Sequence, residues 1–275
     1  MLYLSDLDFT LLKSDLTISS YTKDIWNSCA KNNKLSIATA RSYTGIKELL
    51  KGLDLKEPLI LLDGTIIAKP NGEILHISAI GKELGNEILK TSKSVANLEP
   101  LIVAYEGSSE AFYYPKELNI YQQELLTTMK NRKRVISNEK HEAKSQNLKI
   151  VYMENEENTK ILIDSLKAKL GENIEIKSAK DPYIDCYFTT ILNPDGDKAH
   201  ALKRLEELEG VDANNTTVFG DSHNDIAMFK LAGTSVAVAN AIDELKEVAT
   251  IVLNESNDQD GVAKYLQREC LWSMQ

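Results

Sequence analysis

Short, continuously apolar segments alternate with helical segments at both ends of this 275-residue chain, and this alternation constrains its fold more than any other feature. Strands that are apolar throughout must be covered on both faces, as they are when helices connect parallel strands. We therefore predict a parallel sheet flanked by helices. In the first third of the chain, the pattern predicts strands at 2–4, 35–40 and 58–64, and helices at 20–32 and 43–53.

The last third repeats this alternation. In the segment 197–210 apolar residues recur every three positions, which predicts a helix that Gly210 ends. Further strands are predicted at 216–221, 234–239 and 249–253, and further helices at 223–233 and 241–247.

The middle of the chain, from about residue 78 to 190, has a different pattern. Its strands alternate apolar with polar residues, which is typical of a sheet with one covered and one open face. We predict an inserted α+β domain at 79–189 and a core domain formed by residues 1–78 and 190–275. In the last predicted strand of the insertion, 183–189, three polar or aromatic residues share one face and could line a binding surface or meet solvent: Tyr183, Asp185 and Tyr187.

Charge and composition exclude several classes of protein. The net charge of −9 argues against a nucleic-acid binder that works through a broad basic face. The three cysteines are widely spaced, without a C-x-x-C pair, which favours buried thiols in a reduced compartment over disulfides or a zinc site. We find no secretory signal and no apolar run of about 18 residues, so we expect a cytoplasmic protein without a membrane partner.

Polar residues follow predicted strands, or begin predicted helices, at four places in the predicted core. In open α/β sheets, ligands bind at the carboxyl edge of the strands, where such residues converge. The residues are Asp6 and Asp8 after the first strand, Thr39 at the end of the second, Lys198 at the start of a helix, and Asp221 with Asp225 after the strand segment VFG (218–220).

The segment DLDFT (6–10) resembles the D-x-D-x-T signature of the haloacid dehalogenase-like hydrolases, a superfamily dominated by phosphatases. Thr39, Lys198 and the string GDSHND (220–225) match its second, third and fourth motifs in order. The large insertion between the second and third motifs resembles the Cof-type branch with its subclass IIB cap. The resemblance covers nearly the whole chain, and it implies an α/β fold with a Rossmann-like parallel-sheet core domain and an inserted α+β cap domain.

Two carboxyl groups can divide the work of phosphate ester hydrolysis. One carboxylate can attack phosphorus and form an aspartyl-phosphate, while the other protonates the leaving alkoxide and later deprotonates the attacking water. Residues two apart in an extended turn project to the same side, so Asp6 and Asp8 can act together. The resemblance implies that Asp6 is the nucleophile and Asp8 the acid/base.

The charge of these residues requires a cation. Four ionised aspartates and a phosphate monoester with a charge of about −2 exceed what Lys198 can neutralise, and Mg²⁺ prefers such oxygen ligands. The resemblance implies that Asp6, the backbone carbonyl of Asp8 and Asp221 bind Mg²⁺, with Asp225 either a direct ligand or a supporting residue.

The remaining motif residues are predicted to bind phosphate. Thr39 offers a hydroxyl, Ala40 a backbone N–H group and Lys198 a positive charge, while Asn224 could touch the phosphate or the rest of the substrate. Three residues depart from the family pattern: Phe9 and Ala40 stand where glycine is common, and Asp63 stands where asparagine is usual.

Each of these residues also has a simpler interpretation. Aspartates favour turns and helix N-termini, Thr39 could cap the helix after it, and a lysine in a first helical turn is usually solvated. We do not expect His223 to bind metal, because its surroundings are rich in oxygen. The basic run KNRKR (130–134) is expected to be a solvated helix end, with attraction of an anionic substrate as the alternative.

Three functions remain open at this stage. The leading prediction is a magnesium-dependent phosphatase acting on a small phosphorylated metabolite, such as a sugar phosphate. A phosphomutase is the alternative among enzymes, because the superfamily includes a phosphomannomutase with a similar cap. A non-catalytic sensor of a phosphometabolite is the third reading, and the adjacent carboxyl groups of Asp6 and Asp8 count against it.

Overall fold

The computed structural model describes residues 1–107, 109–128, 134–181 and 184–272 of the chain. The chain divides into two compact units. The core unit comprises Met1–Ile77 and Asp195–Gln275, and the inserted unit comprises Ser78–Pro194. Within the described ranges, no helix combines the length and the apolar character that crossing a bilayer requires.

A parallel sheet forms the centre of the core unit, with the strand order β15-β14-β13-β1-β2 among the described residues. All residues of β1 and β13 are buried, as expected for strands covered on both faces. The predicted α/β fold with a parallel-sheet core is therefore confirmed. The strands are β1 (Leu2–Ser5), β2 (Lys34–Ile37), β13 (Thr216–Gly220), β14 (Thr234–Ala237) and β15 (Ile251–Val252).

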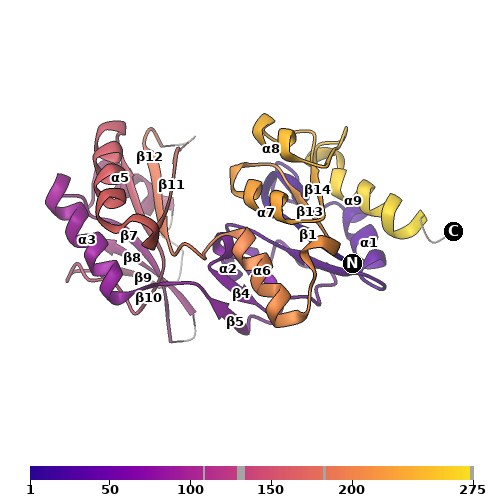
Figure 1. Ribbon diagram of the computed structural model, residues 1–275, viewed down its shortest axis with the longest axis horizontal. Coiled ribbons are helices and arrows are strands. Elements are labelled where there is room, and N and C mark those ends of the chain that lie inside the picture. The colour runs from indigo at the N-terminus through magenta and orange to yellow at the C-terminus, as the bar shows by residue number, and fades with distance from the viewer. Residues whose placement is uncertain (108, 129–133, 182–183, 273–275) are drawn as a thin grey trace. The chain divides into compact units, whose positions relative to one another are not determined.

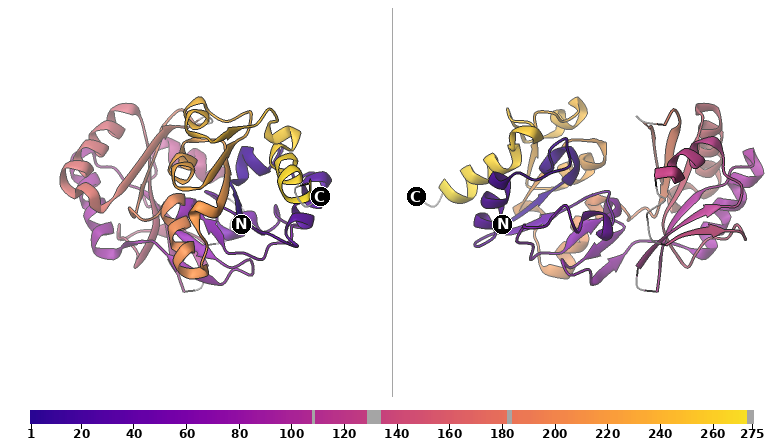
Figure 2. Two further views of the ribbon diagram at one scale, coloured as in Figure 1. Left: turned by 45° about the vertical axis from the view of Figure 1, so that its right-hand side comes forward. Right: turned by 180° about the vertical axis from the view of Figure 1, so that it is seen from behind.

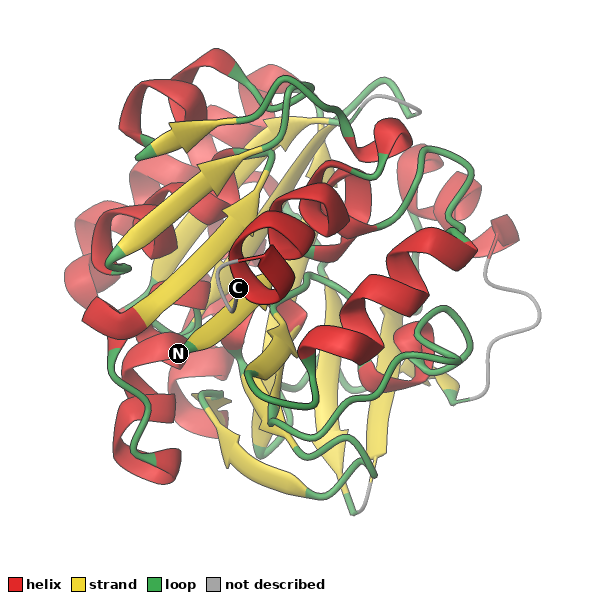
Figure 3. Ribbon diagram, turned by 90° about the vertical axis from the view of Figure 1, so that its right-hand side faces the viewer, coloured by secondary structure: helices red, strands yellow, loops and turns green. Residues whose placement is uncertain are grey.

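Helices cover both faces of this sheet. Figure 1 shows α1 and α9 on one side of the strands and α6 and α7 on the other. Figure 3 shows the helices in red and the strands in yellow from another side. The helices of the core unit are α1 (Ser20–Cys29), α2 (Tyr43–Ile46), α6 (Lys198–Glu209), α7 (Ile226–Leu231), α8 (Asp243–Val248) and α9 (Gly261–Leu266).

A small antiparallel sheet, which the sequence did not predict, follows the second strand of the core. The strand predicted at 58–64 ends at Leu61, because the next residues form a 3-10 turn in which Leu62 and Asp63 have positive φ angles of 51° and 63°. Among the described residues, an isolated bridge between Ala38 and Ile60 joins it to the second strand. The sheet consists of β3 (Leu59–Leu61), β4 (Ile66–Ala68) and β5 (Ile74–Ile77).

The inserted unit is a mainly antiparallel sheet with the order β11-β12-β10-β7-β8-β9 in the described part of the chain, and β6 pairs with β10. Its strands are β6 (Ile80–Gly81), β7 (Leu101–Glu106), β8 (Ser109–Pro115), β9 (Val135–Asn138), β10 (Gln146–Glu154), β11 (Glu175–Lys180) and β12 (Tyr187–Leu192), and its helices are α3 (Lys82–Ala96), α4 (Ile120–Thr128) and α5 (Glu156–Leu170).

Alternation along these strands divides their side chains between two apolar clusters. Ile102 of β7 and Tyr152 of β10 belong to the cluster that includes residues of α3 and α5. Their neighbours Leu101 and Val151 belong to a second cluster, against which residues of α4 pack. The sequence pattern predicted a sheet with one open face, but apolar side chains pack against both faces of this sheet.

The strand predicted at 183–189 begins later in the structure, at Tyr187. Residues 184–186 form a turn instead, in which the Asp181 carboxylate accepts a hydrogen bond from the backbone of Ile184 at 2.8 Å. Asp185 lies in this turn and pairs with Lys180, so it does not share a strand face with Tyr187. Tyr183 and most of the basic run 130–134 lie outside the described residues.

Other differences concern helix ends. The helix predicted at 43–53 is regular only over α2, and turns follow it up to Gly52, which has a φ angle of 96°. The helix predicted at 223–233 begins with a 3-10 turn at His223–Asp225. The sequence did not predict α9, which lies beside α1 in both views of Figure 2.

Candidate active site

The loop after β1 presents the first two aspartates. The backbone N–H of Asp6 donates to the carbonyl of Phe219 on β13 at 2.9 Å, which fixes the start of the loop. The helical turn Leu7–Leu11 follows, interrupted by non-helical backbone at Asp8 and Phe9. Phe9 has a φ angle of 55°, a left-handed conformation that favours glycine, and its carbonyl accepts a hydrogen bond from Asn240 at 2.8 Å.

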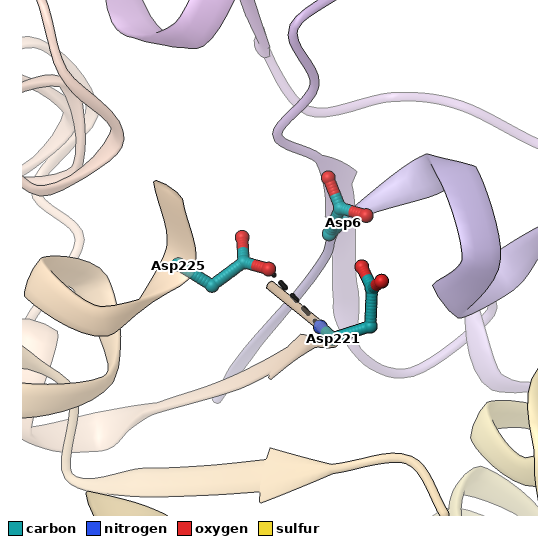
Figure 4. Close-up of side chains that lie close together, drawn as sticks. All are labelled: Asp6, Asp221 and Asp225. Carbon is teal, nitrogen blue, oxygen red and sulfur yellow. Dashed lines mark hydrogen bonds between the residues drawn. The ribbon is translucent and has the colours of Figure 1, made fainter. Parts of the chain in front are cut away.

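Three carboxyl groups meet at the carboxyl edge of β1 and β13. Asp6, Asp221 and Asp225 each offer one carboxylate oxygen to a cluster in which these atoms lie within 4.8 Å of one another. Figure 4 shows the three side chains gathered around one point. Asp6 and Asp225 are buried, and Asp221 is partly buried. The structure therefore unites residues from opposite ends of the chain.

Neighbouring groups hold Asp221 and Asp225 in place. The hydroxyl of Thr10 donates to Asp221 Oδ1 at 3.1 Å. Asp225 Oδ2 accepts hydrogen bonds from the backbone N–H groups of Asp221 at 3.0 Å and Ser222 at 3.1 Å. Asp225 thus does cap the turn after β13, as the simpler interpretation of the sequence allowed, and its other oxygen takes part in the cluster.

Lys198 joins the cluster from the first turn of α6. Its ammonium group lies 2.5 Å from Asp6 Oδ1 and 2.7 Å from Asp225 Oδ1, and its side chain is fully buried. Burial by itself lowers the pKa of a lysine, but Asp225 and Asp6 outweigh this effect and raise the pKa of Lys198. The lysine is therefore charged at all physiological pH values. The alternative of a solvated lysine is wrong.

Two glycines allow these segments to approach closely. A Cβ atom on Gly64, whose φ angle is 115°, would lie 2.1 Å from the carbonyl oxygen of Asp197, the residue before Lys198. A Cβ atom on Gly220 would lie 2.6 Å from the carboxyl carbon of Asp225. Any larger residue at either position would displace a member of the cluster.

Burial and mutual repulsion raise the pKa values of the clustered acids. Desolvation, together with the charges of Asp225 and Asp221, holds the pKa of Asp6 well above its usual range despite the opposing effect of Lys198. Desolvation and the charge of Asp225 raise the pKa of Asp221 to about 6. One lysine does not offset three carboxylates, so the site lacks positive charge.

A divalent cation would supply the positive charge that the three carboxyl groups lack. The donor set consists of carboxylate oxygens, which are the ligands that Mg²⁺ prefers in proteins. His223 is exposed and does not belong to the cluster formed by the described residues. The acidic cluster can therefore hold a metal ion through oxygen ligands alone.

Asp8 does not belong to the cluster of Asp6, Asp221 and Asp225 and pairs instead with a different cation, Arg41. Arg41 Nε donates to Asp8 Oδ2 at 2.7 Å and to Oδ1 at 3.0 Å, and Nη2 donates to Oδ1 at 2.6 Å. These hydrogen bonds raise the pKa of Arg41, and the charge of Asp6 adds to the effect. Sequence reasoning missed Arg41, although it follows Thr39 and Ala40 at the same strand end.

Thr39 and Asn224 are linked through Asp63. The backbone carbonyl of Thr39 accepts from the N–H of Asp63 at 3.0 Å, and the Asp63 carboxylate accepts from the Asn224 amide at 3.1 Å. Thr39 does not cap α2, because the Ser42 side chain does so. Ala40 is exposed in the loop between Thr39 and Arg41.

Comparisons with known proteins agree with this geometry. The family model described as haloacid dehalogenase-like hydrolase matches residues 3–266. A 5-amino-6-(5-phospho-D-ribitylamino)uracil phosphatase of Bacillus subtilis, YwtE, is 27% identical over 290 residues, with 96% of each chain covered. The predicted enzyme class, a phosphoric monoester hydrolase, agrees with the activity in the name of this relative.

Solved structures share the fold. TM0651 from Thermotoga maritima superposes with a TM-score of 0.79 at 24% identity, over 98% of both chains. A subclass IIB sugar phosphatase, BT4131, superposes with a TM-score of 0.72 at 22% identity, over 97% of this chain and 98% of its own. The resemblance noted in the motifs is confirmed: this chain belongs to the haloacid dehalogenase-like hydrolase family.

Proposed function

We propose that this enzyme is a magnesium-dependent phosphatase that hydrolyses a small phosphorylated metabolite through an aspartyl-phosphate on Asp6. The observation that carries the proposal is the buried contact of Asp6 with Lys198, beside two further carboxyl groups. Lys198 engages Oδ1 of Asp6 and so fixes the orientation in which the other carboxylate oxygen, Oδ2, is presented.

In the first step, an Asp6 oxygen forms a bond to phosphorus while the bond from phosphorus to the ester oxygen breaks. Asp8 gives a proton to the departing alkoxide. In the second step, Asp8 takes a proton from a water molecule whose oxygen attacks phosphorus, and the bond between phosphorus and Asp6 breaks. Inorganic phosphate and the two original carboxyl groups result.

The metal ligands we propose are Asp6, the backbone carbonyl of Asp8, and Asp221. Asp225 is proposed as a supporting residue, because its oxygens already accept hydrogen bonds from Lys198 and two backbone N–H groups. When bound, Mg²⁺ supplies positive charge that screens the nucleophile from the phosphoryl oxygens. Burial and the neighbouring carboxylates raise the pKa of Asp6, and a bound cation would favour its ionised, nucleophilic form.

Phosphate binding is assigned to four residues. Lys198 offsets charge on the phosphoryl group, and Thr39 with the N–H of Ala40 donates hydrogen bonds to its oxygens. Asn224, which Ser222 and Asp63 hold by hydrogen bonds, is assigned a contact with the phosphate or with the rest of the substrate.

The substrate we propose is a sugar phosphate or a similar phosphomonoester. The names of its relatives support this class, since one acts on a phosphorylated ribitylamino-uracil and another on sugar phosphates. We assign the choice among such substrates to the inserted unit, Ser78–Pro194, acting as a cap, and we place the reaction in the cytoplasm.

The test is release of inorganic phosphate from a panel of sugar phosphates and from p-nitrophenyl phosphate, with Mg²⁺ and with a chelator. Wild-type protein with Mg²⁺ should release phosphate, and Asp6→Asn should lose at least about 10³-fold of the rate, because an amide is a poor nucleophile. Asp24→Asn on α1, outside the site, is the matched control.

Other outcomes would contradict the proposal. Unchanged activity in Asp6→Asn would refute the assigned nucleophile. Isomerisation of a hexose phosphate without net phosphate release would instead identify a phosphomutase, and tight binding without turnover across the panel would identify a sensor.

A further inference from the structure

The four aspartates of the site differ in what holds them. Lys198 fixes Asp6, Thr10 fixes Asp221, and backbone N–H groups fix Asp225. In the described part of the chain, the Asp8 carboxylate receives all of its hydrogen bonds from Arg41. Arg41 is therefore the residue that determines where this carboxylate points.

The geometry of this contact is specific to arginine. The guanidinium group meets the carboxylate side-on through Nε and Nη2, and a planar fork of this kind fixes both the position and the plane of its partner. A lysine would supply the same charge through a single point and would leave the plane of the carboxylate free.

Asp8 needs such a support because its own backbone provides little. It lies in the interrupted turn Leu7–Leu11, next to the left-handed Phe9, and its side chain is 29% exposed. A catalytic group must be held within about 0.5 Å of its productive position, and a partly exposed carboxylate on a bent loop is not held this well by packing alone.

Arg41 is itself well anchored. Its backbone N–H donates to the Thr39 hydroxyl at 3.1 Å, and its carbonyl accepts a hydrogen bond from Leu62 at 3.0 Å. The loop that contains Thr39 and Ala40, which we propose to bind phosphate, thus also contains Arg41. The same loop therefore positions both the phosphate and the Asp8 carboxylate.

The contact also leaves Asp8 able to react. Oδ1 accepts two hydrogen bonds from Arg41, whereas Oδ2 accepts one, so Oδ2 retains a lone pair for another partner. We propose that Arg41 is a positioning residue that orients the Asp8 carboxylate toward the leaving-group oxygen. This inference rests on the proposed function, in which Asp8 is the acid/base.

The test compares two classes of leaving group. An alkoxide leaves slowly unless it is protonated, whereas p-nitrophenolate is stable enough to leave without an acid. Arg41→Ala should therefore lower kcat/KM for the best sugar phosphate of the panel by about ten- to a hundred-fold, and kcat/KM for p-nitrophenyl phosphate by less than about three-fold. The readout is kcat/KM, which covers the first phosphoryl transfer, because Asp8 is also the base of the second step, which the two substrates share.

A double-mutant comparison identifies the route of the effect. Asp8→Asn should show the same selectivity for leaving group in kcat/KM with a larger loss, and the double variant Arg41→Ala/Asp8→Asn should have a kcat/KM for the sugar phosphate no lower than that of Asp8→Asn alone. Arg204→Ala, which removes an exposed arginine paired with Glu207 on α6, is the matched control and should leave both rates unchanged.

Equal losses of kcat/KM on both substrates, or losses of kcat/KM that multiply in the double variant, would overturn the inference. If Arg41→Ala does not fold, Arg41→Lys keeps the charge but not the fork, and it should show the same selectivity with a smaller loss. An active Asp6→Asn variant would refute the proposed function itself, which distinguishes that failure from a failure of Arg41 alone.

Discussion

Lys198 shows at the scale of one residue how stability and chemistry are joined in this site. A buried ammonium group is stable only with anionic partners, and here Asp6 and Asp225 supply them. Removing the lysine leaves these carboxyl groups buried without a counter-charge, which destabilises proteins more than the pair itself stabilises them.

We therefore expect Lys198→Met to lower the free energy of unfolding by about 3 kcal/mol and to abolish turnover. Urea unfolding and a phosphate-release assay measure the two effects. Lys203→Met, on an exposed position of the same helix, is the control and should change neither quantity. Equal stability of the two variants would show that the buried contacts contribute nothing.

The raised pKa values of the acids give the protein a distinctive dependence on pH. The pKa of Asp221 rises from 3.8 to about 6 on folding, so between these values the folded protein binds more protons than the unfolded chain. Stability contributed by this group is therefore present at low pH and is lost as the pH rises through the folded value.

In the presence of a chelator, we expect the free energy of unfolding of the wild type to fall relative to that of Asp221→Asn between about pH 4 and pH 7. The relative change should be on the order of 2 kcal/mol, and Mg²⁺ should reduce it by binding the ionised carboxylates. Urea unfolding at several pH values provides the measurement. A difference between the proteins that stays constant with pH would contradict the assigned shift.

At the scale of the elements, loop and helix ends position the site, and Gly64 is the clearest case. Its turn, Leu62–Gly64, approaches the N-terminus of α6 so closely that a methyl group would meet the backbone of Asp197. Gly210 also has a positive φ angle, of 61°, but nothing lies within 4 Å of the Cβ atom it would gain. A substitution at Gly210 therefore introduces backbone strain alone, whereas a substitution at Gly64 introduces both strain and a steric clash.

Gly64→Ala should destabilise the protein by more than about 3 kcal/mol and reduce activity, because α6 and Lys198 must move. Gly210→Ala should cost only about 1 kcal/mol, the effect of the positive φ angle alone, and leave activity intact. Thermal unfolding of both variants tests this. Similar losses of stability in the two would show that the close approach to α6 is unimportant.

The sequence predicted the strands that consist of an uninterrupted apolar run and the helix that has a regular apolar spacing and a glycine at its end. The apolar runs of β1, β13 and β14, and α6 with its stop at Gly210, agree with prediction. The hairpin of β4 and β5 was missed, because such short apolar segments have no period of their own.

The sequence also predicted one part of the candidate site, the acidic cluster, and missed another, the contact between Arg41 and Asp8. Residues that follow parallel strands must converge, so the union of Asp6 with Asp221 and Asp225 follows from topology. The ends of β1 and β2 bring Arg41 near Asp8 in the same way, but the fork between their side chains depends on the exact path of two loops, one of them interrupted at Asp8 and Phe9, which no sequence pattern specifies.

At the scale of the whole molecule, both ends of the chain build the core unit, and the middle builds the inserted one. The described residues that we assign to the chemistry all belong to the core unit, so the insertion is free to differ in sequence without altering the carboxylates or the lysine. This division separates the acidic cluster from the part of the chain to which we assign the choice of substrate.

In the mechanism that we propose, Asp6 carries the phosphoryl group during turnover. Acid quenching during steady-state turnover, borohydride reduction and peptide mass spectrometry would test it, since reduction converts an aspartyl-phosphate into homoserine. We expect homoserine at position 6 in wild-type protein and none in Asp6→Asn. Continued turnover with an unmodified Asp6, or modification of another residue in its place, would contradict it.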